Sequence, residues 1–219
     1  MNSGIIFGWD GVIVDSTSAH ERSWSVFADK HNLPLPQNFL LKSFGKRNDF
    51  IITEIFGIAD SPEETEKLSD EKESIFRRIV NEDGIEPLPG IRALLGTLRQ
   101  EHIPSAVLTS ATRKNIDLAL EILDLQHAFS AVITCECVNE SKPATEIFLR
   151  AADALECAPE QCVVVENTLA GIEAARAGGF KTLAVATTNP AKLLERAGAN
   201  FVAEKMTDLS LSTLRAILR

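Results

Sequence analysis

The stretch Ile5-Ile6-Phe7-Gly8-Trp9-Asp10-Gly11-Val12 is the strongest indication of the fold in this sequence. An apolar run that ends in a short turn, with Asp10 and the flexible Gly11 just beyond it, predicts a buried strand that carries polar groups at its carboxyl end. Open α/β sheets place their binding and catalytic sites at such strand ends. We therefore expect a functional site beside Gly8 and Asp10.

Strand-like and helical segments alternate from Gly90 onward. Such alternation predicts an α/β fold with a doubly wound parallel sheet and right-handed crossovers. The expected strands cover 105–108, 131–133, 162–165, 182–185 and, more weakly, 201–202. Helical apolar spacing predicts helices near 91–100, 114–123, 145–155 and 170–177, the last ending at Gly178-Gly179.

The segment between the first strand and this alternating region has helical periodicity and few strand signals. One helix is predicted around Trp24 and Phe27, and another over 64–80. Turn residues at Pro87, Pro89 and Gly90 close the segment. We therefore predict a discontinuous core domain of residues 1–15 and 88–219, with an α-helical cap domain of residues 16–87 inserted into it.

Composition narrows the range of partners. The 219 residues include 22 Lys and Arg against 31 Asp and Glu, a formal net charge of −9. This balance lacks the basic footprint of a protein that binds nucleic acid or an anionic membrane. No run approaches the roughly 20 apolar residues that span a bilayer. We expect a cytoplasmic protein whose partners are small molecules or proteins.

Three further motifs stand at predicted strand ends or helix starts: Leu108-Thr109-Ser110, Ser141-Lys142-Pro143 and Val165-Glu166-Asn167. Together with the opening stretch, they resemble in type and order the four motifs of the haloacid dehalogenase superfamily. The helical insertion resembles the β-phosphoglucomutase and phosphoglycolate-phosphatase subgroup. The resemblance covers nearly the whole chain and implies a Rossmann-like core with a small helical cap.

The resemblance also implies roles for the motif residues. In that family an Asp-x-Asp-Gly motif supplies a nucleophilic aspartate, which takes the phosphoryl group, and a second aspartate as acid and base. The second corresponds to Asp10. Thr109, Ser110 and Lys142 correspond to the residues that hold phosphoryl oxygens. Mg²⁺ is the family cofactor, and residues at the positions of Glu166 and Asn167 help to bind it.

This sequence departs from the family at two of these positions. Gly8 stands where the nucleophilic aspartate is expected, and Asn167 stands where a metal-binding aspartate is usual. Glycine has no nucleophilic side chain, and asparagine lacks the charge that a hard cation prefers. Asp10, Glu166 and Lys142 without a metal have the same formal charge as the family's complete set with Mg²⁺. We therefore expect weak or absent Mg²⁺ binding.

The resulting hypothesis is a protein that binds a phosphorylated small molecule, with a sugar phosphate as the expected class, but lacks or nearly lacks aspartyl-phosphate phosphotransfer. One alternative is a slow or unconventional hydrolase that uses water activated through Asp10. Another is a non-catalytic interaction protein with a vestigial cleft. In the predicted cap, His20, Trp24 and Lys72 resemble positions near the substrate, and the Lys46-Arg47 pair is a further candidate contact.

Each of these residues also has a plainer structural interpretation. Asp10 before a glycine can form a turn, and Thr109 can simply end a strand. Lys142 can be a surface lysine, Glu166 can pair with it for structural reasons only, and Asn167 with its successor can cap a helix.

The cap residues have similar alternatives. His20 and Trp24 can pack in a core. Lys72 and the Lys46-Arg47 pair can lie on solvated helix faces.

Overall fold

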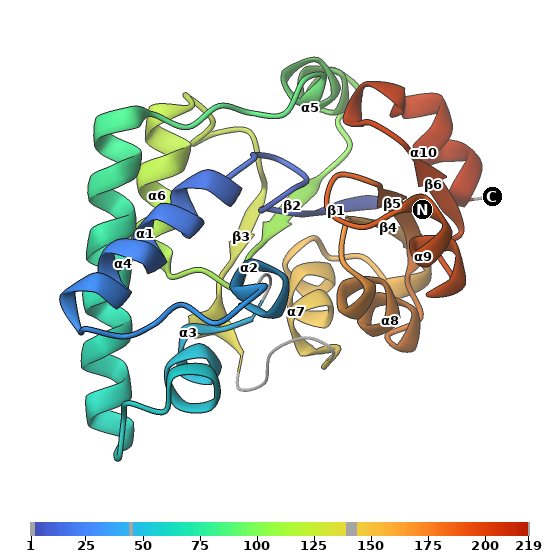
Figure 1. Ribbon diagram of the computed structural model, residues 1–219. Helices are drawn as coiled ribbons and strands as arrows, with labels where there is room; N and C mark the ends of the chain where they lie inside the picture. Colours follow the sequence, from blue (N-terminus) through green and yellow to red (C-terminus); the bar gives the residue numbers. More distant parts are fainter. Residues whose placement is uncertain (1–2, 44–45, 139–143, 219) are drawn as a thin grey trace.

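The computed structural model describes residues 3–43, 46–138 and 144–218. Its centre is a six-stranded parallel sheet with the order β3-β2-β1-β4-β5-β6 (Figure 1). The strands are β1 (Gly4–Gly8), β2 (Ser105–Leu108), β3 (Ala131–Ile133), β4 (Cys162–Glu166), β5 (Lys181–Val185) and β6 (Phe201–Ala203). The predicted doubly wound parallel sheet is confirmed.

Burial on both faces explains why the central strands read as continuous apolar runs. Every residue of β1 and of β4 is buried, and Phe7 pairs with Val107 on one side and Val165 on the other. Alternation along β1 sends Ile5 and Phe7 to one face of the sheet and Ile6 to the opposite face.

Helices cover both faces of the sheet (Figure 1). Helices α5 (Ile91–Gln100), α6 (Arg113–Ile122) and α10 (Leu211–Leu218) pack on the face of Phe7. Helices α7 (Glu146–Ala154) and α8 (Leu169–Ala177) pack on the face of Ile6, and α9 (Ala191–Arg196) packs against α8 and β5. The periodicity analysis missed α9 and α10, because short helices with only one fully buried side chain each leave little apolar pattern.

The segment after β1 is helical, as its periodicity predicts. It comprises α1 (Thr17–Lys30), α2 (Phe39–Ser43), α3 (Asn48–Phe50), the π-helical turn η1 (Ile51–Phe56) and α4 (Pro62–Asp83). The pieces between α1 and α4 were not predicted individually, because each is too short to show a period.

These helices bury their own apolar cluster, which includes Trp24, Phe27 and Ile52. Phe76 and Val80 of α4, however, belong to the apolar cluster on the sheet face. The division into a core and a cap domain therefore stays a prediction.

The chain leaves and returns to the sheet at one place. Val14 pairs with Pro87, and the Leu88 N–H donates to the Ile13 carbonyl at 2.8 Å. Two adjacent backbone segments therefore connect the helical insertion to the sheet, close to the end of β1.

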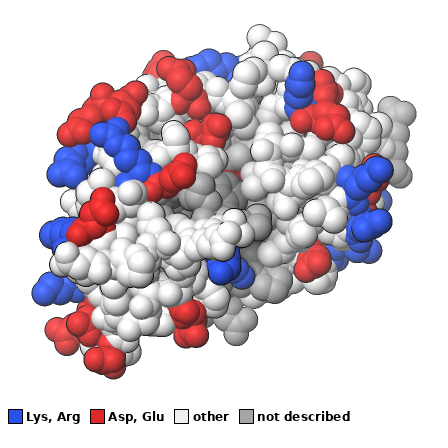
Figure 2. Space-filling model, in the orientation of Figure 1, with Lys and Arg blue, Asp and Glu red and all other residues white. Residues whose placement is uncertain are grey.

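On the face drawn in Figure 2, Lys and Arg side chains lie beside Asp and Glu at the left, and a small group of them lies at the right edge. Within the described residues, none of the helices combines the length and the apolar character of a bilayer span. The longest, α4, has 22 residues but carries charges along its length.

Candidate functional site

The candidate site lies where the strand order reverses, at the carboxyl ends of β1 and β4. In open α/β sheets this is the crevice in which ligands bind. A cavity of about 120 Å³ opens there between the sheet and helices α1 and α4. All the predicted site residues that the structure describes line it: Gly8, Asp10, His20, Trp24, Lys72, Thr109, Ser110, Glu166 and Asn167. Lys142 lies outside the described residues.

Gly8 ends β1 and faces the cavity without a side chain. Its φ lies outside the left-handed region, so its backbone conformation suits any L residue. An added Cβ would lie 3.3 Å from Cγ2 of Val12 and 3.5 Å from Oε1 of Glu166. The backbone geometry therefore does not require glycine here, and Val12 would have to shift by only a few tenths of an ångström to admit a Cβ.

A tight loop follows Gly8 and presents Asp10 to the cavity. The Trp9 carbonyl accepts the N–H groups of Ile13 at 2.8 Å and Val14 at 3.2 Å, and the Gly11 N–H donates to the Val14 carbonyl at 2.7 Å. Gly11 has φ of +74°, and an added Cβ would lie 2.0 Å from Nδ2 of Asn167. Here glycine is required by both conformation and space.

Gly11→Ala is expected to lower the free energy of unfolding by about 3 kcal/mol. Two costs contribute: the strain of an alanine in the left-handed backbone region and the clash of its Cβ with Asn167. Urea unfolding measures this loss. Gly57→Ala is the matched control, since Gly57 has φ of +64° but its added Cβ would meet nothing closer than 3.9 Å. The control should lose only about 1 kcal/mol. Equal losses in the two variants would contradict the proposed contact with Asn167.

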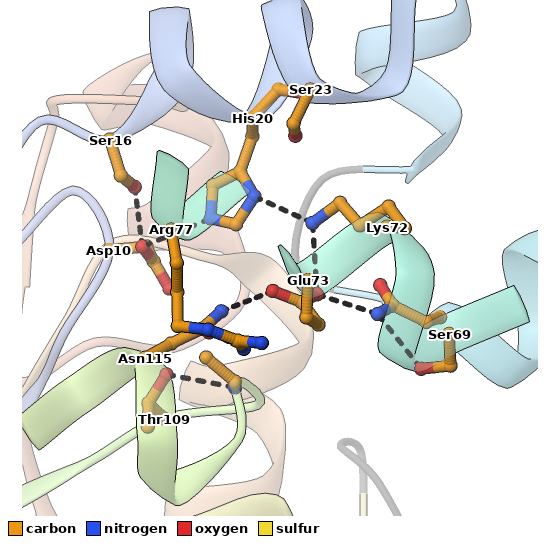
Figure 3. A network of polar contacts seen from close by, with 12 residues as sticks. Asp10, Ser16, His20, Ser23, Ser69, Lys72, Glu73, Arg77, Thr109 and Asn115 are labelled. Carbon is orange, nitrogen blue, oxygen red and sulfur yellow. Dashed lines mark hydrogen bonds and ion pairs between the residues drawn. The ribbon is translucent and has the colours of Figure 1, made fainter. Parts of the chain in front are cut away.

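Asp10 is held by residues of α1 and the turn before it (Figure 3). The Ser16 hydroxyl donates to Oδ1 of Asp10, and Nε2 of His20 lies 3.5 Å from the same oxygen. On the opposite side of the ring, the Lys72 ammonium lies 3.2 Å from Nδ1 of His20. Because an ammonium can only donate, Nδ1 accepts, and the ring proton resides on Nε2, facing Asp10.

Two opposing effects set the pKa of Asp10. Burial raises it, while the hydrogen bonds from His20 and Ser16 and the charge of Lys72 lower it, and the net result is a pKa below the ordinary 3.8. Asp10 is therefore a carboxylate at neutral pH. As a carboxylate it can accept a proton.

A buried ion pair on α4 completes this network (Figure 3). Lys72 is 1% exposed, and its Nζ lies 2.9 Å from Oε1 of Glu73 and 5.0 Å from the centre of the Trp24 ring. The solvated-face interpretation of Lys72 is therefore wrong. Lys72 lies on the same helix face as the apolar residues Ile75 and Phe76, and this face is turned inward.

Glu73 links three elements. Its carboxylate also accepts Nδ2 of Asn48 at 2.6 Å and Nδ2 of Asn115, which lies on α6. Burial raises the pKa of Glu73, but Lys72, His20 and Asn48 outweigh it and lower the pKa to about 2. Sequence reasoning missed Glu73. The available signal was a charged residue three positions before Phe76, on the apolar face of α4.

The end of β4 is organised around Glu166. Its Oε2 accepts the N–H groups of Asn167 at 2.9 Å and Thr168 at 3.0 Å, together with the Thr168 hydroxyl at 2.9 Å. Thr168, rather than Asn167, caps α8, because its Oγ1 accepts the Gly171 N–H. The Asn167 amide instead donates to Oγ1 of Thr188 at 2.7 Å.

These residues are a poor fit for Mg²⁺, which prefers octahedral oxygen ligands including one or two carboxylates. Gly8 offers no side-chain ligand, Asn167 offers a neutral amide, and Oε2 of Glu166 is already engaged by three donors. Among the described His, Cys, Asp and Glu side chains, no three are grouped so that they could hold a metal ion.

Thr109 and Ser110 follow β2 on the other side of Gly8. The Thr109 N–H donates to the Ile133 carbonyl at 3.0 Å, which extends the strand, and its Oγ1 accepts the Ala111 N–H at 3.0 Å. Because the hydroxyl accepts there, its own proton can be donated to an anion. Lys46 also lines the cavity, whereas Arg47 is paired with Asp49 at 3.3 Å.

Comparisons with known proteins identify the family of this chain. The family model described as haloacid dehalogenase-like hydrolase matches residues 5–185. The chain belongs to this family. The β-phosphoglucomutase of Bacillus subtilis is 29% identical over 216 residues, covering 96% of this chain and 92% of that protein. The crystal structure of a β-phosphoglucomutase from Clostridium difficile aligns with a TM-score of 0.85 at 23% identity, covering 100% of this chain and 97% of the other.

A chloroplast relative from Arabidopsis thaliana, 5-amino-6-(5-phospho-D-ribitylamino)uracil phosphatase, is 29% identical over 217 residues. These cover 98% of this chain, which spans only 57% of that protein's length. By their names, both curated relatives act on phosphorylated small molecules. The predicted resemblance to haloacid dehalogenase-like and β-phosphoglucomutase-like proteins is confirmed.

Proposed function

We propose that this member of the haloacid dehalogenase-like family binds a phosphorylated small molecule, of the sugar-phosphate class, without forming an aspartyl-phosphate. The observation that carries the proposal is Gly8. It lies at the tip of β1 in the cavity, its backbone conformation suits a residue with a side chain, and it has none. The covalent route has no nucleophile at this position.

Anion binding does not depend on the missing carboxylate. The Thr109 hydroxyl and Ser110 lie on one side of Gly8, and the Lys142 ammonium is the expected cation, as the motif order implies. The network of Ser16, His20 and Lys72 keeps Asp10 ionised and directed at the cavity, which supports a ligand site rather than a vestigial cleft.

Weak or absent Mg²⁺ binding belongs to the same proposal. A family site without its nucleophile and with a neutral Asn167 has lost two of the negative charges that a dication offsets. Calorimetric titration with MgCl₂ should show no binding at micromolar concentrations. Tight binding of Mg²⁺ would contradict this part of the proposal.

Inorganic phosphate is expected to bind at millimolar concentration. Lys142→Ala should weaken this binding about 20-fold, because it removes one charge-assisted hydrogen bond. Isothermal titration calorimetry measures both. Lys192→Ala, which removes an exposed lysine that does not line the cavity, is the matched control and should bind phosphate like the native chain. Absence of phosphate binding to the native chain, or equal binding to Lys142→Ala, would refute the proposal.

One second candidate is favoured by a specific observation. Asp10 is ionised and oriented by Ser16 and His20, so it could activate water for slow hydrolysis of a bound phosphate ester. Phosphate release by the native chain that disappears in Asp10→Asn, without a phosphorylated protein intermediate, would favour this candidate.

A further inference from the structure

A second, larger cavity adjoins the candidate site. It has a volume of about 700 Å³ and extends outward between the start of α4 and the loops after β2 and β3. We call it the outer cavity. Ser110, Asn48 and Glu73 line both cavities. A ligand whose phosphate lies beside Thr109 and Ser110 therefore has the outer cavity as the space for its remaining atoms.

The described lining of the outer cavity is strongly acidic. It contains a single basic side chain, Arg47, whose Nε is 3.3 Å from the Asp49 carboxylate. The carboxylates are those of Asp49, Asp60, Glu66, Asp70, Glu73 and Glu136. Such a wall attracts ammonium groups, accepts hydrogen bonds from hydroxyls and repels a second phosphate.

The polar groups at the inner end of this cavity are already committed. Glu73 accepts a hydrogen bond from the amide of Asn115, which lines neither cavity and itself accepts NH1 of Arg77 at 2.8 Å. Glu73 is itself held in place by Lys72 and Asn48. The lining therefore presents a fixed carboxylate where a second phosphate would need a donor.

One group in the lining has no partner. Oγ1 of Thr112 is buried and makes no hydrogen bond within the part of the chain that the structure describes. A buried polar atom without a partner costs free energy, and a hydroxyl or ammonium of a ligand would relieve that cost. Because a hydroxyl both donates and accepts, Thr112 indicates a polar occupant, and the acidic residues alone select its charge.

We propose that the outer cavity receives the end of the ligand remote from its phosphate and selects a neutral polyhydroxyl or cationic group there, excluding a second phosphate. The ligand class is thus a sugar monophosphate, with preference for an amino sugar phosphate. This inference rests on the proposed function, because the phosphate end is placed by the candidate site.

Calorimetry at low ionic strength tests the proposal with four probes: inorganic phosphate, glucose 6-phosphate, glucosamine 6-phosphate and glucose 1,6-bisphosphate. We expect glucosamine 6-phosphate to bind about 5-fold tighter than glucose 6-phosphate and the bisphosphate about 10-fold weaker, from Coulomb interactions across several ångströms of partly solvated space. High salt should reduce both ratios.

Charge neutralisation shows whether the outer cavity causes these ratios. The triple variant Asp60→Asn, Glu66→Gln and Asp70→Asn changes exposed residues only, removes three of the six carboxylates and should move both ratios toward one. The matched control neutralises three exposed carboxylates that line neither cavity, Glu121→Gln, Glu173→Gln and Glu195→Gln, and should leave the ratios unchanged.

Two outcomes would overturn the inference. If inorganic phosphate binds but the bisphosphate binds at least as tightly as glucose 6-phosphate, the outer cavity does not exclude a second phosphate, while the proposed function stands. The same holds if both triple variants change the ratios equally. If inorganic phosphate itself fails to bind, the proposed function fails and this inference fails with it.

Discussion

The double variant Gly8→Asp/Asn167→Asp is expected to gain Mg²⁺-dependent phosphatase activity that the native chain lacks. Position 8 can take the new side chain because its φ is ordinary and the tight contact, 3.3 Å from an added Cβ to Cγ2 of Val12, is relieved by a shift of a few tenths of an ångström. The second change replaces a neutral amide by a carboxylate at the end of β4. Thr188, which now accepts from Asn167, can rotate its hydroxyl to donate instead.

Electrostatics explain why both changes are needed together. A carboxylate at position 8 would lie close to Oε1 of Glu166 and to Asp10, and such like charges repel one another unless a cation lies between them. The second new carboxylate adds a ligand of the kind that Mg²⁺ prefers. We expect the rate of phosphate release from sugar phosphates to be at least about 1000-fold above that of the native chain, because the variant gains both a nucleophile and a metal ion.

A matched control separates nucleophilic chemistry from metal binding. Gly8→Asn/Asn167→Asp has the same shape at position 8 but no carboxylate, and should release no phosphate above background. Mass spectrometry of a quenched reaction should detect a phosphorylated side chain at position 8 only in the Gly8→Asp/Asn167→Asp variant. Robust Mg²⁺-driven release by the native chain, or a phosphorylated adduct on it, would show that Gly8 does not disable the site.

Much of this site follows from sequence because parallel strands bring their carboxyl ends together. Gly8, Thr109 and Glu166 are far apart in the chain, yet each ends or follows a strand with a strong apolar pattern, and β1 lies between β2 and β4. Alternation of strands and helices is sufficient to predict that these residues meet.

The sequence pattern does not show which side chains from distant parts of the chain contact each other. Glu73 is identified only when α4 and α6 are placed side by side, because its partner Asn115 is 42 residues away and has no distinguishing spacing. Ser16 likewise matters through its contact with Asp10. Lys72 was a candidate from resemblance, but its burial depends on how α4 packs against Trp24 and Phe76.

Glu73→Gln is expected to remove about 3 kcal/mol of stability at neutral pH and to flatten the acid side of the stability profile. The pKa of Glu73 is lowered from 4.5 to about 2 in the folded protein. A carboxyl group with a lowered folded pKa stabilises the fold above its unfolded pKa, and that stabilisation disappears as the pH falls toward the folded pKa. A shift of this size corresponds to about 3 kcal/mol, lost between pH 4.5 and pH 2.

Urea unfolding at a series of pH values measures the effect. The native chain should lose stability steeply below pH 4.5, and Glu73→Gln should lose less, since glutamine does not titrate. Glu71→Gln is the matched control on the same helix, because Glu71 pairs with Lys30 and His31 near the surface and such a pair contributes at most about 1 kcal/mol.

A double variant tests the role of the buried ion pair itself. Removing Glu73 alone leaves the Lys72 ammonium, 1% exposed, without its carboxylate, and an unpaired buried charge is strongly destabilising. Lys72→Met/Glu73→Gln removes that charge as well and should recover part of the loss, so the two changes are not additive. If the losses of Lys72→Met and Glu73→Gln simply add, or if Glu73→Gln behaves like Glu71→Gln, the ion pair does not hold α4 against the site.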